Sequence, residues 1–138
     1  MRDATLGEMD PIMTALRKWE MKSTAVHTKL LHLDTARENI RRAIKERRVK
    51  FVGGYMVMFD IGADWFTNRE VLIEQFIMKV YEHDTSMSAQ DAVNALAIVA
   101  QDYGVPAIFA GDTQTGHMIS KYQTAGFQVL GVQLVKEI

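Results

Sequence analysis

The sequence predicts one domain, residues 1–138, with a mixed α/β (α+β) fold in which helices flank a central β-sheet. Three observations support this prediction. Helix and strand signals alternate from about residue 71 to the end of the chain. The longest apolar run, Val71–Tyr81, is rich in β-forming residues and is bounded by polar ones. Finally, 138 residues is the length of one ordinary domain with a sizeable core.

Composition excludes several classes of protein. Apolar residues make up 48% and charged residues 24%, as in globular proteins. A net charge of −1 gives no general attraction to nucleic acid or to a membrane surface, so neither partner is expected. Cysteine is absent, which excludes disulfides and thiolate chemistry. With no membrane-length apolar run and no signal-like segment, we expect a cytoplasmic protein.

The first half of the chain predicts two helices after a brief strand signal around Ala4. Asp10-Pro11 is typical of a helix start, and the helix should run to about Met21. A capping box, Thr35 to Glu38, predicts a second helix that continues to Arg47 or Arg48. Its outer face is strongly basic. A solvated face is favoured, and contact with phosphates is the alternative.

From Phe51 onward the pattern changes to strands. Phe51–Val52 and Tyr55–Phe59 are β-rich and are separated by a tight turn at Gly53-Gly54. Trp65–Phe66 predicts a short edge strand, and Val71–Tyr81 predicts a long central one. Strict alternation along the central strand would put five side chains on one face: Leu72, Glu74, Phe76, Met78 and Val80. A carboxylate on such a face should point into a wet cleft or be paired.

The last third alternates helix and strand. Ser88 is a plausible cap and Gly104 a plausible stop for a helix over Ala89–Tyr103. A buried strand is expected over Pro106–Ala110, then a short helix from about residue 115 that ends at Gly126. An apolar strand, Phe127–Val135, should complete the sheet.

The end of this segment resembles the closing motif of the GNAT acyltransferase superfamily. That motif runs Asn, three residues, Ala, three residues, Tyr, and then Gly-Phe after three more. Here the Tyr is Tyr122 and the Gly-Phe is Gly126-Phe127, while Thr115 and Met118 stand roughly at the Asn and Ala positions. The resemblance implies a GNAT-like mixed sheet. Small GNAT-like chains of this size also occur among tailed-phage proteins, some of them parts of the particle.

The superfamily holds the pyrophosphate of acyl-coenzyme A on a loop of the form Gln/Arg-x-x-Gly-x-Gly/Ala. The corresponding loop here is His83–Ser88, with serines at both glycine positions, where a positive φ would strain them. Asp84 adds an unfavourable negative charge. The resemblance implies that acetyl-coenzyme A would contact ten residues: Met78, Val80, Asp84, Thr85, Ser86, Met87, Ser88, Ala89, Thr115 and Met118.

Two residues are candidates for catalysis. The resemblance implies that Tyr122 protonates the departing thiolate as a general acid, although a tyrosine here could equally just pack its ring. Glu74 could accept a proton from an attacking amine, but a structural ion pair or a solvent-facing carboxylate is the favoured reading. The histidines lack metal-ligand spacing, so no metal site is expected. The nucleophile elbow Gly-x-Ser-x-Gly does not occur, so a serine hydrolase is unsupported.

Two functions therefore stay open. The first is N-acetyl transfer from acetyl-coenzyme A to an amine. The second is a binding or structural module, for example a phage virion component, that kept the fold and lost the chemistry; it would have protein partners. Either could form a homo-oligomer.

Overall fold

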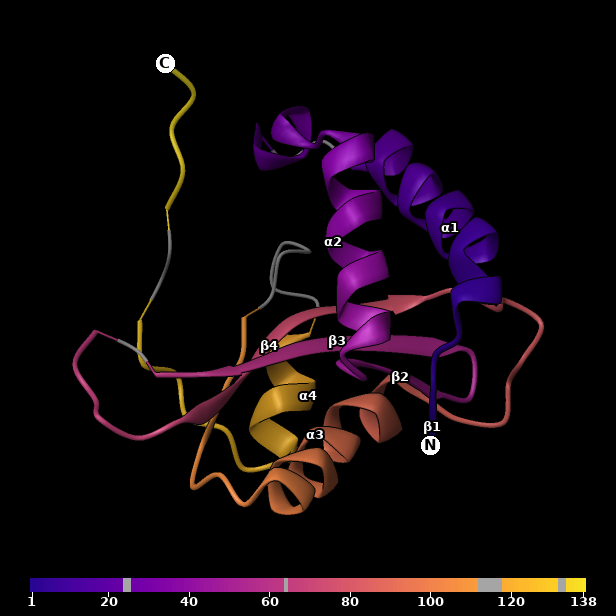
Figure 1. Ribbon diagram of the computed structural model, residues 1–138. Coiled ribbons are helices and arrows are strands. Elements are labelled where there is room, and N and C mark those ends of the chain that lie inside the picture. The colour runs from indigo at the N-terminus through magenta and orange to yellow at the C-terminus, as the bar shows by residue number, and fades with distance from the viewer. Residues whose placement is uncertain (24–25, 64, 112–117, 132–133) are drawn as a thin grey trace.

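The computed structural model describes residues 1–23, 26–63, 65–111, 118–131 and 134–138, which form a mixed sheet with helices on both faces (Figure 1). The elements, with η for a 3₁₀ helix, are β1 (Arg2–Asp3), η1 (Leu6–Glu8), α1 (Met9–Lys22), η2 (Val26–Leu30), α2 (Leu33–Lys45), β2 (Val49–Val52), β3 (Tyr55–Gly62), β4 (Val71–Lys79), α3 (Ala89–Tyr103), β5 (Ile108–Phe109) and α4 (Ile119–Thr124). The predicted α+β class is confirmed.

The five strands follow one another across the sheet in the order β1-β2-β3-β4-β5. Neighbours from β1 to β4 are antiparallel, and β4 and β5 are parallel. Helices α1 and α2 cover one face, and α3 and α4 lie on the other (Figure 1). Alternate side chains of the middle strands therefore enter two separate cores, one beneath each helical layer.

Helices α1 and α3 confirm their predictions. The helix expected from Asp10 to Met21 runs from Met9 to Lys22 and buries Ile12, Met13 and Leu16. In α3 the Ser88 hydroxyl accepts a hydrogen bond from the amide of Asp91, and Gly104 ends the helix at φ 68°. Glycine reaches this left-handed conformation without the steric cost that a side chain would add.

The capping box predicted for α2 is wrong, because the helix begins at Leu33, two residues before Thr35. The ring Nδ1 of His32 accepts a hydrogen bond from the Thr35 amide at 3.3 Å, so an imidazole caps this helix. Helix α2 also ends earlier than predicted, at Lys45. Arg47 has φ 58°, a left-handed conformation that a right-handed helix cannot include.

The strands differ from prediction mainly at their ends. β2 begins two residues earlier than expected, β3 extends to Gly62, and Gly53-Gly54 forms the predicted turn. Trp65 and Phe66 form a turn instead of an edge strand, and their rings stack edge to face. β4 confirms the central strand, since it pairs with a strand on each side.

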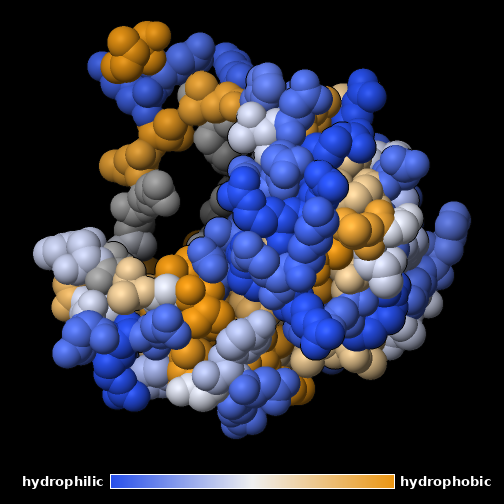
Figure 2. All heavy atoms as spheres, viewed as in Figure 1, coloured by the Kyte–Doolittle hydropathy of each residue, from blue (hydrophilic) through white to orange (hydrophobic). Residues whose placement is uncertain are grey.

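The terminal strand predicted over Phe127–Val135 is wrong for the residues that the structure describes, 127–131 and 134–135, none of which pairs in the sheet. The Phe127 amide donates to the Tyr122 carbonyl at 3.0 Å, which turns the chain back on α4. Beyond this turn Leu130 and Leu134 are more than 80% exposed. The described part of this segment lies away from the sheet in Figures 1 and 2, and Glu137 near its end forms an ion pair with Lys29 at 3.2 Å. Since β5 has only two residues, it offers a short template for a further strand.

Candidate functional site

Strands β4 and β5 pair over only two residues before β5 ends. Leu72 and Ile73 lie opposite Ile108 and Phe109, and β4 then continues to Lys79. Within the described part of the chain, no strand pairs with this side of β4 beyond Ile73. With respect to the described residues, β4 therefore has an open backbone edge from Gln75 to Lys79, with which an extended ligand that carries amide groups could pair.

A β-bulge lies where this open edge begins. Met58 of β3 is opposite Phe76, and the next residue, Phe59, is opposite Glu74, so Gln75 is extra. The extra residue reverses the alternation of side chains along β4. The predicted shared face is therefore wrong for the set Leu72, Glu74, Phe76, Met78 and Val80. The first two lie on the α3 side of the sheet, and the other three lie on the α1–α2 side.

Glu74 is a buried carboxylate at the point where β4 and β5 separate. It is 8% exposed and lies opposite Phe59, a member of the α3-side core. Its Oε2 accepts a hydrogen bond from the amide of Gly111, two residues beyond β5, at 3.3 Å. The bulge thus directs a carboxylate into an apolar layer beside the open edge. A carboxylate in that position can accept a proton from a group bound along β4.

Tyr122 lies in the same α3-side core. Its ring is 7% exposed and packs edge to face on Phe127, with ring centroids 5.3 Å apart. This geometry accounts for the Tyr-x-x-x-Gly-Phe spacing, because Gly126 at φ 92° returns Phe127 to the tyrosine ring. Tyr122 and Glu74 therefore lie on the same side of the sheet, and the proposed proton donation by Tyr122 stays a prediction.

The loop between β4 and α3 has its own carboxylates bound to its serines. Asp84 accepts hydrogen bonds from the amide and hydroxyl of Ser86, at 3.0 and 2.5 Å. Asp91 accepts from the amide and hydroxyl of Ser88, at 2.8 and 3.0 Å. The hydrogen bonds from Ser86 also lower the pKa of Asp84, which therefore stays charged. The donors of both serines thus serve internal anions instead of a bound phosphate.

The expected strain in these serines is absent. Among the described residues, Arg47 is the one non-glycine residue with positive φ. A positive φ occurs instead in the neighbouring Gly53-Gly54 turn, where Gly53 has φ 57°. Ser86 and Ser88 therefore differ from glycine here through their side chains and hydrogen bonds and not through backbone strain.

The Gly53-Gly54 turn supports the loop, a role that the sequence pattern did not predict. The carbonyl of Gly54 accepts hydrogen bonds from the amides of Val80 and Tyr81, at 2.8 and 3.1 Å. A Cβ at Gly54 would lie 2.4 Å from the Tyr81 carbonyl, closer than atoms can approach. The two adjacent glycines could have indicated this contact, because glycines in a turn often allow two backbone segments to approach closely.

The loop is also anchored from the N-terminus by a buried carboxylate. Glu8 accepts hydrogen bonds from both terminal nitrogens of Arg2, at 2.7 and 2.9 Å, and from the Tyr81 hydroxyl at 2.5 Å. The Thr5 amide donates a further bond at 3.1 Å. The hydrogen bonds from Arg2, more than those from Tyr81 and Thr5, lower the pKa of Glu8 to about 2. The chain just beyond β4 is therefore held in place at Tyr81.

The residues predicted to contact acetyl-coenzyme A fall into three groups. Those in the loop and at the start of α3, Asp84, Thr85, Ser86, Met87, Ser88 and Ala89, are contiguous, and Met118 packs against the α3-side core at the start of α4. Met78 and Val80 have side chains on the other side of the sheet, facing α1. Thr115 lies outside the described residues.

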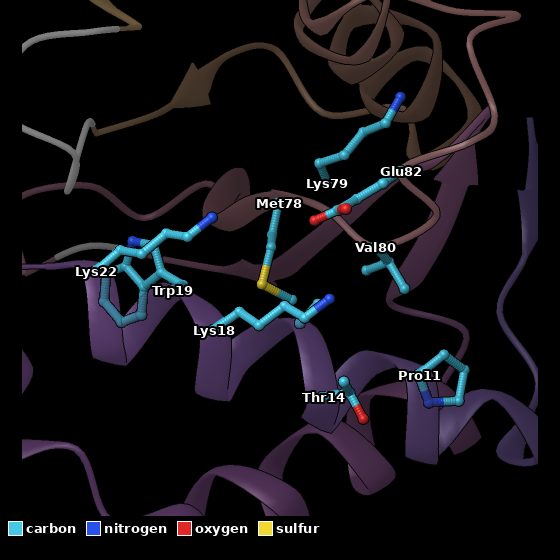
Figure 3. Close-up of a pocket in the computed structure, with 10 residues that line it drawn as sticks. Pro11, Thr14, Lys18, Trp19, Lys22, Met78, Lys79, Val80 and Glu82 are labelled. Carbon is cyan, nitrogen blue, oxygen red and sulfur yellow. The ribbon is translucent and has the colours of Figure 1, made fainter.

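Met78 and Val80 line a pocket between α1 and the end of β4, which we term the α1 pocket (Figure 3). Its volume is about 340 Å³, and its lining consists of Pro11, Thr14, Ala15, Lys18, Trp19, Lys22, Met78, Lys79, Val80 and Glu82. It lies on the opposite side of the sheet from the Glu74 carboxylate. The sequence pattern predicted that Glu74, Met78 and Val80 share one face of β4. The bulge at Gln75 places Glu74 on one face and the other two on the opposite face.

Solved structures with this fold include acetyltransferases. The chain is similar to a possible acetyltransferase from Clostridium difficile, with a TM-score of 0.63, 12% identity, and coverage of 99% of this chain and 95% of that one. It is similar to an acetyltransferase of Trypanosoma brucei, with a TM-score of 0.61, 13% identity and coverage of 99% and 97%. An integron cassette protein from the Cole Harbour salt marsh metagenome gives a TM-score of 0.69, 13% identity and coverage of 99% and 88%.

Likeness at this level of identity shows the fold alone, a GNAT-like mixed sheet flanked by helices, and activity has to be argued from the site. No protein-family model matches the sequence, and no curated protein gives a significant match. Within the described ranges, no helix is long and apolar enough to cross a membrane. The same residues contain no group of three His, Asp or Glu side chains placed to hold a metal ion.

Proposed function

We propose that this protein transfers an acetyl group from acetyl-coenzyme A to an amine. The observation that carries the proposal is the buried Glu74 carboxylate at the point where β5 leaves the open edge of β4. Acetyl-coenzyme A would supply an acyl group activated as a thioester. Its pantetheine arm contains amides, which suit the edge of β4 from Gln75 to Lys79, where no described strand pairs.

The chemistry needs two proton transfers, one to this chain and one from it. As the amine nitrogen bonds to the acyl carbon, Glu74 accepts a proton from the nitrogen, directly or through water. As the carbon–sulfur bond breaks, the electron pair stays on sulfur, and the Tyr122 hydroxyl donates a proton to it. The products are an amide and a free thiol. Burial of Glu74 and Tyr122 beside the same core keeps water from competing for either proton.

The loop limits how tightly the donor binds. Asp84, Thr85, Ser86, Met87, Ser88 and Ala89 would lie nearest the pyrophosphate. Because Asp84 and Asp91 already accept the hydrogen bonds of both serines, phosphates must bind without those donors and beside two negative charges. We therefore expect weak binding of acetyl-coenzyme A in the native chain.

The experiment is a thiol-release assay with acetyl-coenzyme A and a panel of primary amines, from a polyamine to a lysine-containing peptide. The chain has no cysteine, so a thiol reagent reads only released coenzyme. Glu74→Gln should lower kcat by about 10²–10⁴, the usual contribution of a general base. Tyr122→Phe should lower kcat with little change in KM for the donor. Glu70→Gln, at an exposed position before β4, is the control.

A binding module without catalysis is the second candidate, and the internal hydrogen bonds of Ser86 and Ser88 favour it. In that case the native chain and the Glu74→Gln variant should release thiol equally slowly. Acetyl-coenzyme A should then also fail to raise the melting temperature. Turnover that depends on Glu74 would exclude this alternative.

A further inference from the structure

The α1 pocket is large enough to hold a small molecule, and the proposed acyl transfer does not use it. Its volume of about 340 Å³ falls within the range of roughly 300–1,000 Å³ that is usual for ligand pockets. One wall is apolar, formed by Trp19, Met78 and Val80. Trp19 packs edge to face on Phe76, with ring centroids 5.4 Å apart, which fixes the orientation of its indole. A flat or apolar group can therefore be held against this wall.

Two lysines border the pocket from the same side of α1. Lys18 and Lys22 are four residues apart, so their side chains are neighbours on the helix, and both extend toward Met78 (Figure 3). Neither has an ion-pair or hydrogen-bond partner among the described residues. Like charges at this spacing destabilise a helix, and a bound anion between them would remove that repulsion.

The other two charged residues of the lining differ in their roles. The Lys79 ammonium donates to the Asp84 carbonyl and lies 4.6 Å from the centroid of the Tyr55 ring. It is directed away from the pocket (Figure 3). Glu82 is exposed, and its carboxylate points back toward the pocket. The charges that a ligand would meet are therefore two ammonium groups and one carboxylate.

The charge of the surrounding layer also favours an anion. Residues 17–50, which include the last six residues of α1 and all of α2, contain eleven Lys and Arg and four Asp and Glu. Their net charge is +7, and the rest of the chain carries −8, although the whole chain carries only −1. Such segregation produces a local positive potential that concentrates anions at the helical face.

We propose that the α1 pocket binds a small organic anion, with its phosphate or carboxylate between Lys18 and Lys22 and its apolar body against Trp19. The unpaired lysines, the apolar wall and the charge of the helical layer all point to this class of ligand. A merely solvated lysine pair accounts for the exposure of both side chains, but it does not account for the concave apolar wall beside them.

Trp19 can report the binding directly. The chain has two tryptophans, and Trp65 is 92% exposed in the turn between β3 and β4, so Trp65→Phe leaves Trp19 as the one tryptophan, whose emission can be excited selectively over that of tyrosine. We would titrate this variant with phenyl phosphate and, in parallel, with phenol as the uncharged match. Phenyl phosphate should change the Trp19 emission and saturate at a concentration at least about tenfold below phenol, with an affinity that falls as salt rises.

Charge variants complete the test. The double variant Lys18→Gln with Lys22→Gln should weaken the binding of phenyl phosphate about tenfold or more and leave the binding of phenol unchanged. Lys45→Gln removes an exposed, unpaired lysine at the end of α2 and should have little effect. Glu82→Gln should strengthen phenyl phosphate binding. The proposal is overturned if phenyl phosphate binds no better than phenol, or if Lys45→Gln weakens it as much as the double variant does. None of these readouts depends on acyl transfer, so failure here leaves the proposed function intact.

Discussion

Replacing Glu8 by Gln should destabilise the fold at neutral pH and have little effect in acid. Glu8 is 9% exposed and accepts hydrogen bonds from Arg2, Tyr81 and Thr5. Its pKa falls from 4.5 to about 2 in the folded chain, mainly because of the Arg2 hydrogen bonds. A lowered folded pKa means that the stabilisation is complete above pH 4.5 and is lost as the pH falls from 4.5 toward 2.

The magnitude follows from that pKa difference, which corresponds to about 3 kcal/mol. Arg2 is half exposed, and solvent screens its charge, so we expect about 2 kcal/mol from the carboxylate. Urea unfolding of the native chain and of Glu8→Gln at about pH 7 should differ by this amount, and at about pH 3 the difference should shrink by more than half.

The matched control is Glu38→Gln, which removes an exposed carboxylate 3.6 Å from Arg41 on α2. It should change the free energy of unfolding by less than about 0.5 kcal/mol at either pH. A Glu8→Gln difference that is equally large at both pH values would refute the account, because it would arise from packing and not from the charged hydrogen-bonded cluster.

Three further outcomes are expected. Gly54→Ala should destabilise the fold by more than about 2 kcal/mol in thermal or urea unfolding, since its Cβ would overlap the Tyr81 carbonyl. Gly104→Ala should cost only about 1 kcal/mol, because its Cβ meets open space and only the positive φ of 68° opposes it. Phe127→Ala should cost about 3 kcal/mol by removing the ring that packs on Tyr122, and a cost near zero would mean that Phe127 does not cover this core. Leu134→Ser should leave unfolding of the isolated chain within about 0.5 kcal/mol, because this side chain is 86% exposed; a larger loss would reveal a contact that covers it.

Much of the fold could be predicted because local signals and burial agree. The Asp10-Pro11 start of α1, the Ser88 cap and Gly104 stop of α3, and the β-rich run of β4 each specify one element. The terminal strand failed because an apolar, β-rich segment becomes a strand only when a neighbour offers backbone groups to pair with. In the structure the residues after Phe127 have no such neighbour among those described.

The site was harder to predict because it depends on a bulge that has no sequence signature. Strict alternation put Glu74, Met78 and Val80 together, and one extra residue at Gln75 separates them onto opposite faces. The loop His83–Ser88 could be located through the resemblance to the superfamily, with which its spacing agrees. The hydrogen bonds from its serines to Asp84 and Asp91 depend on side-chain geometry, which spacing does not specify.

The most direct test of acyl transfer at the open edge of β4 is calorimetric titration of acetyl-coenzyme A into the native chain and into Asp84→Asn. The asparagine keeps an oxygen that can accept the Ser86 hydrogen bonds and removes one negative charge beside the expected phosphates. The account predicts weak, saturable binding to the native chain, with a Kd above about 100 µM, and binding at least about fivefold tighter to the variant. Absence of binding to both proteins at millimolar acetyl-coenzyme A would contradict the proposal that this fold still serves as an acetyltransferase.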